Sequence, residues 1–252
     1  MSRGDGDVRD RAAVDRSLAG ARVVISAFSA FGRTGVTPRD VDEEGNANLI
    51  AASMHHRVEH FVLVSVRGAA SDHPMELARM KFRAEQRLVA SDLRWTILRP
   101  STFTETFQAA LCAPLLAHRK AIVFGRASNP VNFISAHDVA RIVELAVCER
   151  SSGNEIVELG GSENLSLVEF VTAFAGALAL PCRIKHVPRT AMRVLAQLAR
   201  PFNPRFARMA RAGVIMDTTD MAFDASPLST RYPQIAWTTV AQAARRDYAR
   251  PA

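Results

Sequence analysis

The chain has 252 residues, of which 48% are hydrophobic, and a formal net charge of +7. This length is sufficient for one large domain, or for one domain with a smaller lobe. Because no run of about eighteen apolar residues occurs, we expect no membrane span, and the polar start MSRGDGDVRDR is not typical of a signal peptide. The three cysteines lie far apart, which predicts reduced thiols, a cytoplasmic protein and no metal site.

The positive charge comes almost entirely from arginine, since lysine occurs only at positions 81, 120 and 185. An arginine excess is found in proteins that bind phosphate or nucleic acid, but it also arises when arginine is spread over a whole surface. No basic stretch alternates with aromatic residues on which bases would stack. We therefore favour the second interpretation and expect no nucleic-acid partner.

The first half of the chain alternates apolar strands with amphipathic helices. In chain order we expect a short helix at 10–20, a strand at 22–28, a helix from residue 37, a strand at 61–66, a helix at 73–90 and a strand at 93–98. Such alternation predicts a parallel sheet covered on both faces. Ligands bind at the carboxyl ends of the strands in such sheets, which is where Ser65, Lys81 and the loop at 99–103 fall.

The second half is less regular. We expect helices at 104–117, 135–150, 166–180 and 238–250, a helical stretch at 189–216 that is broken at Pro201 and Pro204, and strands at 121–124, 131–134, 154–161 and 182–187. A first domain at 1–130 and a smaller lobe at 131–252 follow, with some later strands returning to the main sheet. The stretch 189–216 mixes arginine with apolar residues, which is typical of a membrane-surface helix pair or of a lobe helix with a solvated basic face. We favour the lobe helix and expect no membrane partner.

Seven motifs keep an order and spacing that identify a family. They are VVISAF (23–28), GNANLIAAS (45–53), HFVLVSVRGA (60–69), RMKFRAEQRL (79–88), LRWTILRPSTFTETF (93–107), NFISAHDVA (132–140) and NEIVELGG (154–161). With these motifs the chain resembles the NmrA-like, atypical members of the short-chain dehydrogenase/reductase superfamily. The resemblance implies an α/β fold, a Rossmann-like doubly wound parallel sheet with a small C-terminal substrate lobe, and a bound NADP or NAD.

One part of the family pattern has no counterpart here. Members open with a strand and a glycine-rich turn that lets the backbone approach the pyrophosphate. The segment GDVRDRAAVDRSLAG matches the family only from the end of its third strand. We therefore expect either that Met1 is a mis-assigned start or the chain a fragment, or that the chain is a truncated paralogue. Without the missing strand, the strand at 22–28 becomes a hydrophobic edge that invites pairing with other chains, so a homo-oligomer is one outcome.

The resemblance also implies the site residues. Lys81 and Ser65 take the catalytic positions, and the cofactor-binding positions are Asp7, Val8, Ser26, Ala27, Phe28, Ser65, Lys81, Pro100, Ser101, Thr102 and Phe103. Lys81 also stands out by itself, because it lies in the apolar stripe of its helix with Leu77, Ala84 and Leu88. A lysine that passes the sheet edge or pairs with Glu85 would explain the same position. We expect Lys81→Ala to weaken cofactor affinity with little effect on folding.

The superfamily's catalytic tyrosine is missing. Leu77 occupies its position, and no tyrosine occurs before Tyr232. Glu105 and His73 are replacement proton donors by position only. We expect an NAD(P)(H)-binding oxidoreductase that reduces a small carbonyl, imine or enone substrate. The alternatives are a dinucleotide-binding sensor or regulator without turnover, and a truncated paralogue that binds no cofactor.

Overall fold

The computed structural model describes residues 6–148, 153–199 and 201–249. The chain forms two compact units: the first contains residues 1–100 and 142–158, and the second contains residues 101–141 and 159–252. The chain thus leaves the first unit at residue 100, returns to it within a helix, and leaves it again within a strand. The sequence analysis divides the chain instead into a cofactor-binding domain at 1–130 and a substrate lobe at 131–252. That division by function stays a prediction.

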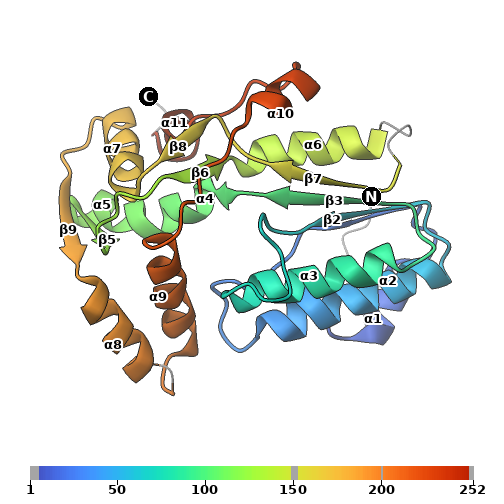
Figure 1. The fold of residues 1–252 in the computed structure, drawn as a ribbon. Helices are drawn as coiled ribbons and strands as arrows, with labels where there is room; N and C mark the ends of the chain where they lie inside the picture. Colours follow the sequence, from blue (N-terminus) through green and yellow to red (C-terminus); the bar gives the residue numbers. More distant parts are fainter. Residues whose placement is uncertain (1–5, 149–152, 200, 250–252) are drawn as a thin grey trace. The chain divides into compact units, whose positions relative to one another are not determined.

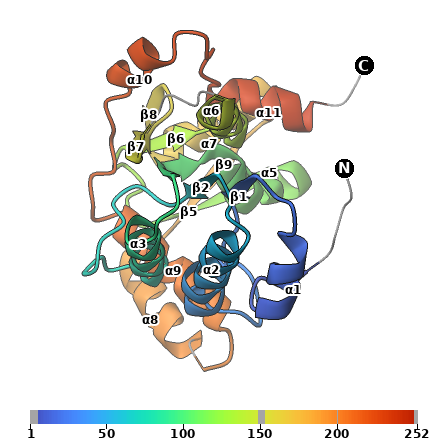
Figure 2. The ribbon, with the colours of Figure 1, turned by 90° about the vertical axis from the view of Figure 1, so that its right-hand side faces the viewer.

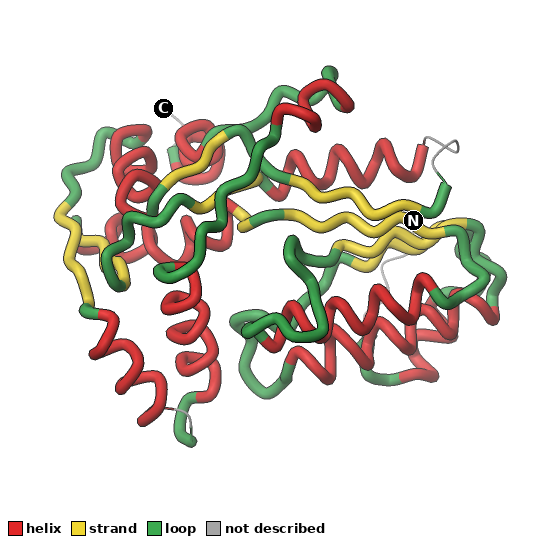
Figure 3. The backbone as a smooth tube through the Cα atoms, in the orientation of Figure 1, coloured by secondary structure: helices red, strands yellow, loops and turns green. Residues whose placement is uncertain are grey.

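The first unit is built on a four-stranded sheet. Its strands are β1 (Val23–Ser26), β2 (His60–Val64), β3 (Trp95–Pro100) and β7 (Glu155–Leu159), hydrogen-bonded in the order β1-β2-β3-β7 (Figure 3). β1 pairs with β2, and β2 with β3, in parallel register. The parallel sheet predicted from the alternating pattern is confirmed, and β7 is a later strand that returns to it, as was expected of some later strands without saying which.

Helices cover both faces of this sheet. α2 (Asn46–His55) and α3 (Glu76–Val89) lie on one face, α1 (Arg11–Ser17) packs beside α2, and α6 (Ala136–Cys148) lies on the other face (Figure 1). The core between the sheet and α3 contains Phe61, Leu63 and Ile97 from the strands and Leu88 from the helix, all fully buried. Burial of such side chains contributes about 1.5–3 kcal/mol each, which holds the helices on the sheet.

Local capping signals set the helix starts. The Asp10 carboxylate accepts hydrogen bonds from the first backbone N–H groups of α1. Thr37 and Asp40 form a reciprocal pair, with Asp40 N to Thr37 Oγ1 at 3.2 Å and Thr37 N to Asp40 Oδ2 at 2.8 Å. The helix that follows differs from prediction, because its first part, η1 (Arg39–Gly45), is wound as a π-helix before α2 begins.

The second unit holds two small sheets. β4 (Thr102–Phe103), β6 (Val131–Ile134) and β8 (Glu163–Leu165) form one, and β5 (Lys120–Phe124) pairs in parallel with β9 (Arg183–Val187) in the other. The helices of this unit are α4 (Thr104–Phe107), η2 (Gln108–Cys112), α5 (Ala113–His118), α7 (Leu167–Ala177), α8 (Arg189–Ala199), α9 (Pro204–Met216), α10 (Ser226–Arg231) and α11 (Val240–Tyr248). The helix predicted at 104–117 is three consecutive pieces, and β4, β8 and α10 are elements that the sequence analysis did not predict.

The helix pair α8–α9 shows the expected break near Pro201. The two helices lie side by side (Figure 2), and apolar side chains on them remain exposed, up to 89% for Phe202 in the connection. Arg200, which belongs to the basic stretch, lies outside the described residues. Within the described ranges, none of the helices combines the length and apolar character needed to cross a bilayer.

Candidate functional site

The carboxyl edge of the first-unit sheet brings several predicted residues together. Phe28 follows β1 closely, Ser65 follows β2 directly, and Lys81 reaches the same edge from α3. The Lys81 ammonium donates hydrogen bonds to Phe28 O at 2.9 Å and to Val64 O at 3.1 Å, and so bridges the ends of β1 and β2. Its Nζ also lies 5.8 Å from the centre of the Phe28 ring. Lys81 thus lies at the strand ends, and its role in cofactor binding stays a prediction.

Lys81 has a buried ionic partner that was not predicted. Its Nζ lies 3.3 Å from Oδ1 of Asp42, and the two residues are only 3% and 0% exposed. Burial lowers the pKa of Lys81, while the Asp42 carboxylate and then Glu85 act to raise it. Phe28 O and Val64 O accept two of the ammonium protons, whereas Asp42 Oδ1 pairs with Lys81 by charge and accepts no hydrogen bond within the described residues. The alternative of a pair with Glu85 is not what the helix forms.

Ser26 belongs to the same network. Its hydroxyl donates to Oδ1 of Asn46 at 2.6 Å, and Asn46 Nδ2 donates to the carbonyl of Asp42 at 2.7 Å. Asp42 Oδ2 in turn accepts the backbone N–H of Ala30 at 3.0 Å. Asp42 and Asn46 are four residues apart, so they share one side of the helical segment. The run RDVDEEGNAN at 39–48 is mostly polar, so no local pattern sets these two residues apart.

Ser65 belongs to a second buried hydrogen-bond network, which links it to Glu85 and Arg99. Its hydroxyl donates to Glu85, which is fully buried and accepts two hydrogen bonds from the Arg99 guanidinium, at 3.0 and 2.6 Å. The pKa of Arg99 is raised, chiefly by its hydrogen bond with Glu85. Nη1 of Arg99 lies 3.7 Å from Glu158 on β7. Arg99 therefore anchors a strand end, and Ser65 is held by it through Glu85.

Asp7 and Val8 lie before α1. Asp7 is exposed, and its carboxylate binds the Arg9 side chain and backbone N–H, which lower its pKa to about 2. Val8 is half-buried; its carbonyl accepts from Asn48 Nδ2 at 3.0 Å, and a Cβ on Gly45 would lie 2.8 Å from its Cγ2. Val8 thus packs closely on the start of α2, while the edge of the Asp7 carboxylate faces solvent.

Pro100 and the three residues after it are divided between the units. Pro100 is buried as the last residue of β3, in the first unit. Ser101, Thr102 and Phe103 belong to the second unit, where Ser101 Oγ donates to Asn132 Oδ1 at 2.8 Å. Thr102 and Phe103 pair with Phe133 and Ile134 of β6 as β4. The expected loop at 99–103 is therefore strand over most of its length.

The replacement proton donors have structural partners. Glu105 accepts from Ser135 Oγ at 2.6 Å and from the N–H of Ala136, and so caps α6. His73 Nδ1 accepts the N–H of Met75 at 3.0 Å in the turn before α3. Asp138 holds Thr238 through its N–H and its hydroxyl, at 2.7 and 2.9 Å, rather than closing a capping box with Ser135.

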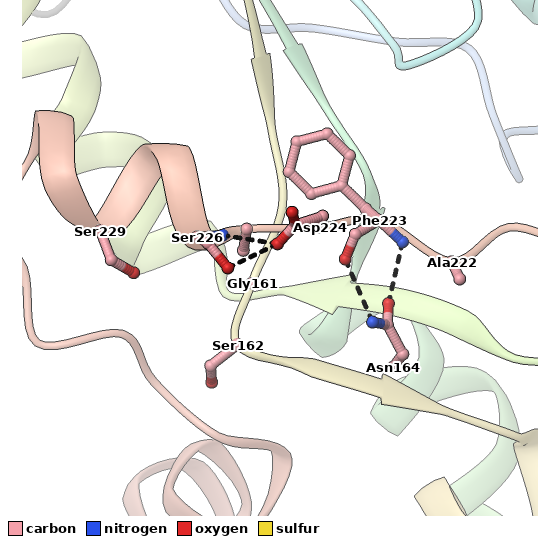
Figure 4. Close-up of a pocket in the computed structure, with 9 residues that line it drawn as sticks. Gly161, Ser162, Asn164, Ala222, Phe223, Asp224, Ser226 and Ser229 are labelled. Atoms are coloured by element: carbon pink, nitrogen blue, oxygen red, sulfur yellow. Dashed lines mark hydrogen bonds between the residues drawn. The ribbon is translucent and has the colours of Figure 1, made fainter.

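The second unit also contains a hollow of about 540 Å³ that the sequence did not indicate. Figure 4 shows how Asn164 holds the backbone of Phe223 on one side and Asp224 binds Ser226 on the other. A Cβ on Gly161 would lie 2.0 Å from Phe133 O, so only glycine permits this backbone approach. The lining residues are Gly161, Ser162, Asn164, Ala222, Phe223, Asp224, Ala225, Ser226 and Ser229.

Comparison with solved structures supports the fold. An NADPH-dependent quinone oxidoreductase of Escherichia coli in complex with NADPH superposes with a TM-score of 0.74 at 19% identity, over 96% of this chain and 82% of that one. Triphenylmethane reductase of Citrobacter sp. gives a TM-score of 0.75 at 14% identity, over 96% and 81%. At these identities the likeness establishes a Rossmann-type fold and no activity.

Sequence comparison finds curated relatives of two kinds. The chain is 25% identical to photosystem II assembly factor Ycf39 of Synechocystis sp., over 83% of this chain and 65% of that protein. It is 26% identical to an NAD(P)H azoreductase of Xenophilus azovorans, over 71% and 59%. The chain thus spans less than two thirds of the length of these relatives.

A family model described as NAD(P)H-binding matches residues 3–147, more than half of the chain. The match covers all of the first-unit residues at the edge described above. It agrees with the parallel sheet, with the structural neighbours that bind NADPH, and with the family resemblance of the seven motifs. The chain therefore belongs to the NAD(P)H-binding family of Rossmann-type proteins.

Proposed function

We propose that the carboxyl edge of β1, β2 and β3 binds the nicotinamide nucleotide of NADPH or NADH and that the protein reduces a small carbonyl, imine or enone. The observation that carries this proposal is the convergence of Phe28, Ser65 and Lys81 on one edge of a parallel sheet. In sheets of this type the carboxyl edge is where ligands bind. One relative bears the name NAD(P)H azoreductase, which supports a reductase.

The residues at this edge fit the sugar and ring end of a dinucleotide. Ala27 is exposed and Phe28 is half-buried, so the end of β1 offers a small residue and an aromatic one to a ligand. In the loop at 29–36, Gly32 and Gly35 have φ of +72° and +75°, and no atom lies within 4 Å of a Cβ built on either. Backbone of this kind can approach a ligand closely. We assign no residue to the pyrophosphate.

The roles of the polar side chains follow from their contacts. Lys81 holds the carbonyls of Phe28 and Val64 at fixed positions and adds a positive charge below the edge, which Asp42 balances. Ser65 is oriented by Glu85, which Arg99 fixes in turn. The cofactor-binding roles of Ser101, Thr102 and Phe103 stay predictions. When bound, the cofactor supplies a hydride.

The proton of such a reduction needs a source. Leu77 stands where a tyrosine would donate, and Glu105 and His73 are engaged in capping and turn contacts. We therefore propose that the proton comes from water or from an acidic group of the substrate. Enones suit this scheme, because their reduction leaves an enolate that solvent can protonate without a protein acid.

A second candidate function is a dinucleotide sensor without turnover. It is favoured by two observations, the leucine at the tyrosine position and a lysine whose ammonium is held by Phe28 O, Val64 O and the Asp42 charge. A protein of this kind would bind NADPH and change its interactions with a partner. The photosystem II assembly factors among the relatives carry a name that describes assembly and no reaction.

One pair of measurements separates these functions. Titration with NADPH and NADH should raise the free energy of unfolding by about 2.7 kcal/mol when the ligand is present at a hundred times its Kd. Steady-state assays against aldehydes, imines, enones, quinones and azo compounds should then show oxidation of NADPH with at least one acceptor. Binding without oxidation would identify the sensor, and no stabilisation by either nucleotide would contradict both functions.

To measure how much Lys81 contributes to NADPH binding, the substituted protein must still fold. Lys81→Ala alone leaves the buried Asp42 carboxylate without its cation, so the expectation of little effect on folding must be revised. The double substitution Lys81→Met with Asp42→Asn removes both charges. We expect it to weaken NADPH binding about tenfold or more if Lys81 contacts the ribose. Unchanged affinity would restrict Lys81 to a structural role.

The proposal places the protein with reduced nucleotides in the cytoplasm. Cys112, Cys148 and Cys182 are free thiols, which is typical of reducing compartments. The proposed partner is a small-molecule substrate. A second copy of the chain at the β1 edge is a further proposal, for which a test is given in the Discussion.

A further inference from the structure

We propose that Asp15, His55 and His56 form a binding site for a divalent transition-metal ion of the Zn²⁺ class. The sequence predicts no metal site, because Asp15 is 40 residues from His55 and no spacing pattern connects them. In the folded chain one ligand atom from each residue lies within 4.8 Å of the other two. The site lies wholly within the first unit.

Two packed helices position the three side chains. Asp15 is on α1, His55 is the last residue of α2, and His56 caps that helix. His55 Nδ1 lies 2.8 Å from Asp15 Oδ1, His56 Nε2 lies 3.3 Å from the same oxygen, and the imidazole centres are 4.7 Å apart. The C-terminal end of a helix carries partial negative charge, so α2 itself favours a cation at this place.

The chemistry of these groups fits a metal better than an ion pair. The Nε2 atom of His56 is buried and makes no hydrogen bond to any part of the chain that the structure describes. A buried imidazole nitrogen without a partner is costly, and it is aimed at the carboxylate. Two imidazoles and one carboxylate are a usual ligand set for Zn²⁺, with water in the fourth position. His55 is 69% exposed on its side chain, which leaves room for that water.

Metal binding needs only small changes at the site. When the ion binds, His55 keeps its proton on Nε2 and presents Nδ1, while His56 keeps its proton on Nδ1 and presents Nε2. No bond other than the hydrogen bond between His55 and Asp15 has to break. Ligand distances of about 2.0–2.2 Å then draw the three atoms together around one ion.

The position of the site separates it from the nucleotide edge. His55 and His56 precede β2, which begins at His60, whereas Lys81 contacts Val64 at the other end of that strand. A metal here would clip α1 to α2 and would not reach the residues proposed for hydride transfer. The inference therefore does not depend on the proposed function.

The test is a Zn²⁺ titration of the full chain by isothermal calorimetry, after treatment with a chelator. We expect one equivalent to bind, and Co²⁺ in its place to give the visible absorption of a tetrahedral site. Each of Asp15→Asn, His55→Ala and His56→Ala should weaken binding by about a hundredfold or more, since even an outer partner of a metal ligand is worth about 10–100-fold. His118→Ala removes an exposed histidine of the second unit and serves as the matched control.

The outcomes separate this site from surface binding. Loss of binding in the three variants and retention in His118→Ala would support the site. No binding by the parent chain, or equal loss in His118→Ala, would overturn it. Circular dichroism of each variant checks the fold, and His55→Ala, which alters an exposed side chain, keeps the test valid if His56→Ala does not fold.

Discussion

The buried pair Lys81–Asp42 is the strongest stability determinant that we identify among the candidate site residues. Lys81→Met alone should cost about 3–5 kcal/mol, because it leaves an uncompensated carboxylate in the core. Adding Asp42→Asn should recover most of this loss, since the remaining amide and thioether carry no charge. Urea unfolding of the two variants measures the difference. Equal destabilisation by the single and the double substitution would show that shape, and not charge, dominates at this place.

His60 predicts a pH dependence of stability. Its ring is buried, with Nε2 2.9 Å from Thr96 Oγ1, and burial, followed by the nearby Arg94 charge, lowers its pKa below 6.5. The unfolded chain therefore binds a proton at His60 at a higher pH than the folded chain does. The stabilisation is complete above the unfolded pKa and is lost as the pH falls through the lowered folded pKa.

The measurement compares the parent chain with His60→Gln, which keeps a polar group near Thr96 but cannot titrate. Unfolding free energies at about pH 7.5 and about pH 5.5 should fall more for the parent chain than for the variant. The other histidines are present in both proteins, so their contributions cancel. The same loss in both proteins would assign the pH dependence to other groups.

For single residues, the sequence predicted which side chains lie at the sheet edge better than it predicted their hydrogen-bond and ionic partners. Lys81 could be found because a lysine in an apolar stripe is unusual. Asp42 could not be assigned to it, because the two are 39 positions apart and only the fold brings η1 against α3. The metal cluster was missed for the same reason. A contact between distant helices leaves no local pattern in the chain.

Among the elements, β1 has an unusual exposure. It lies at the end of the strand order, and Val23 and Ile25 are 36% and 48% exposed. An edge strand with apolar side chains favours pairing with another chain. We expect the protein to self-associate through β1, and Ile25→Lys to shift sedimentation velocity profiles towards the monomer.

The matched control for this edge is Ile156→Lys. Ile156 is 44% exposed on β7, at the other end of the same sheet. If association is lost in Ile156→Lys and kept in Ile25→Lys, the contact uses β7 instead. A parent chain that is monomeric at all concentrations would contradict association through either edge.

The elements that the sequence predicted well are those with strong periodicity or capping signals. Ser166 and Glu169 form a capping box at the start of α7, with Glu169 N to Ser166 Oγ at 3.2 Å and Ser166 N to Glu169 Oε2 at 2.8 Å. β4 has two residues and β8 has three, which is too short for a period of two to be recognised. The π-helical winding of η1 and η2 was also hidden, since one added residue per turn changes the pattern very little.

On the scale of the whole molecule, the three thiols should report separately on the two units. Cys112 is fully buried in the second unit, and burial followed by the nearby Cys182 raises its pKa to about 12. Cys182 is half-buried there, with a pKa raised by burial, whereas Cys148 is exposed on α6. Because the thiolate is the reactive form, Cys148 should react first and Cys112 last.

Labelling with iodoacetamide near pH 8, followed by peptide mass analysis, measures this order. Modification of Cys112 should need unfolding of the second unit and should accelerate with urea. If Cys112 reacted as fast as Cys148 in the absence of urea, the burial of the Cys112 thiol would be contradicted. Cys182→Ser provides a control, because it leaves the burial of Cys112 unchanged and removes the neighbouring thiol.

The fold class, the parallel sheet and the family were within reach of the sequence, since each depends on patterns repeated along the chain. The partition into units was not, because it depends on where β7 pairs. Residues 142–158 return to the first unit after a long excursion, and no composition change marks the crossings.

This interrupted path has a consequence for synthesis on the ribosome. β3 hydrogen-bonds to β7, so the sheet of the first unit stays one strand short until residue 159 has been made. At about 5–20 residues per second, the stretch from 101 to 159 takes on the order of 3 to 12 seconds. During that interval the β3 edge of the hydrophobic sheet is open on the nascent chain. Chaperone binding in the cell should therefore be strongest on ribosomes that have passed the codon for residue 100 and have not yet exposed β7.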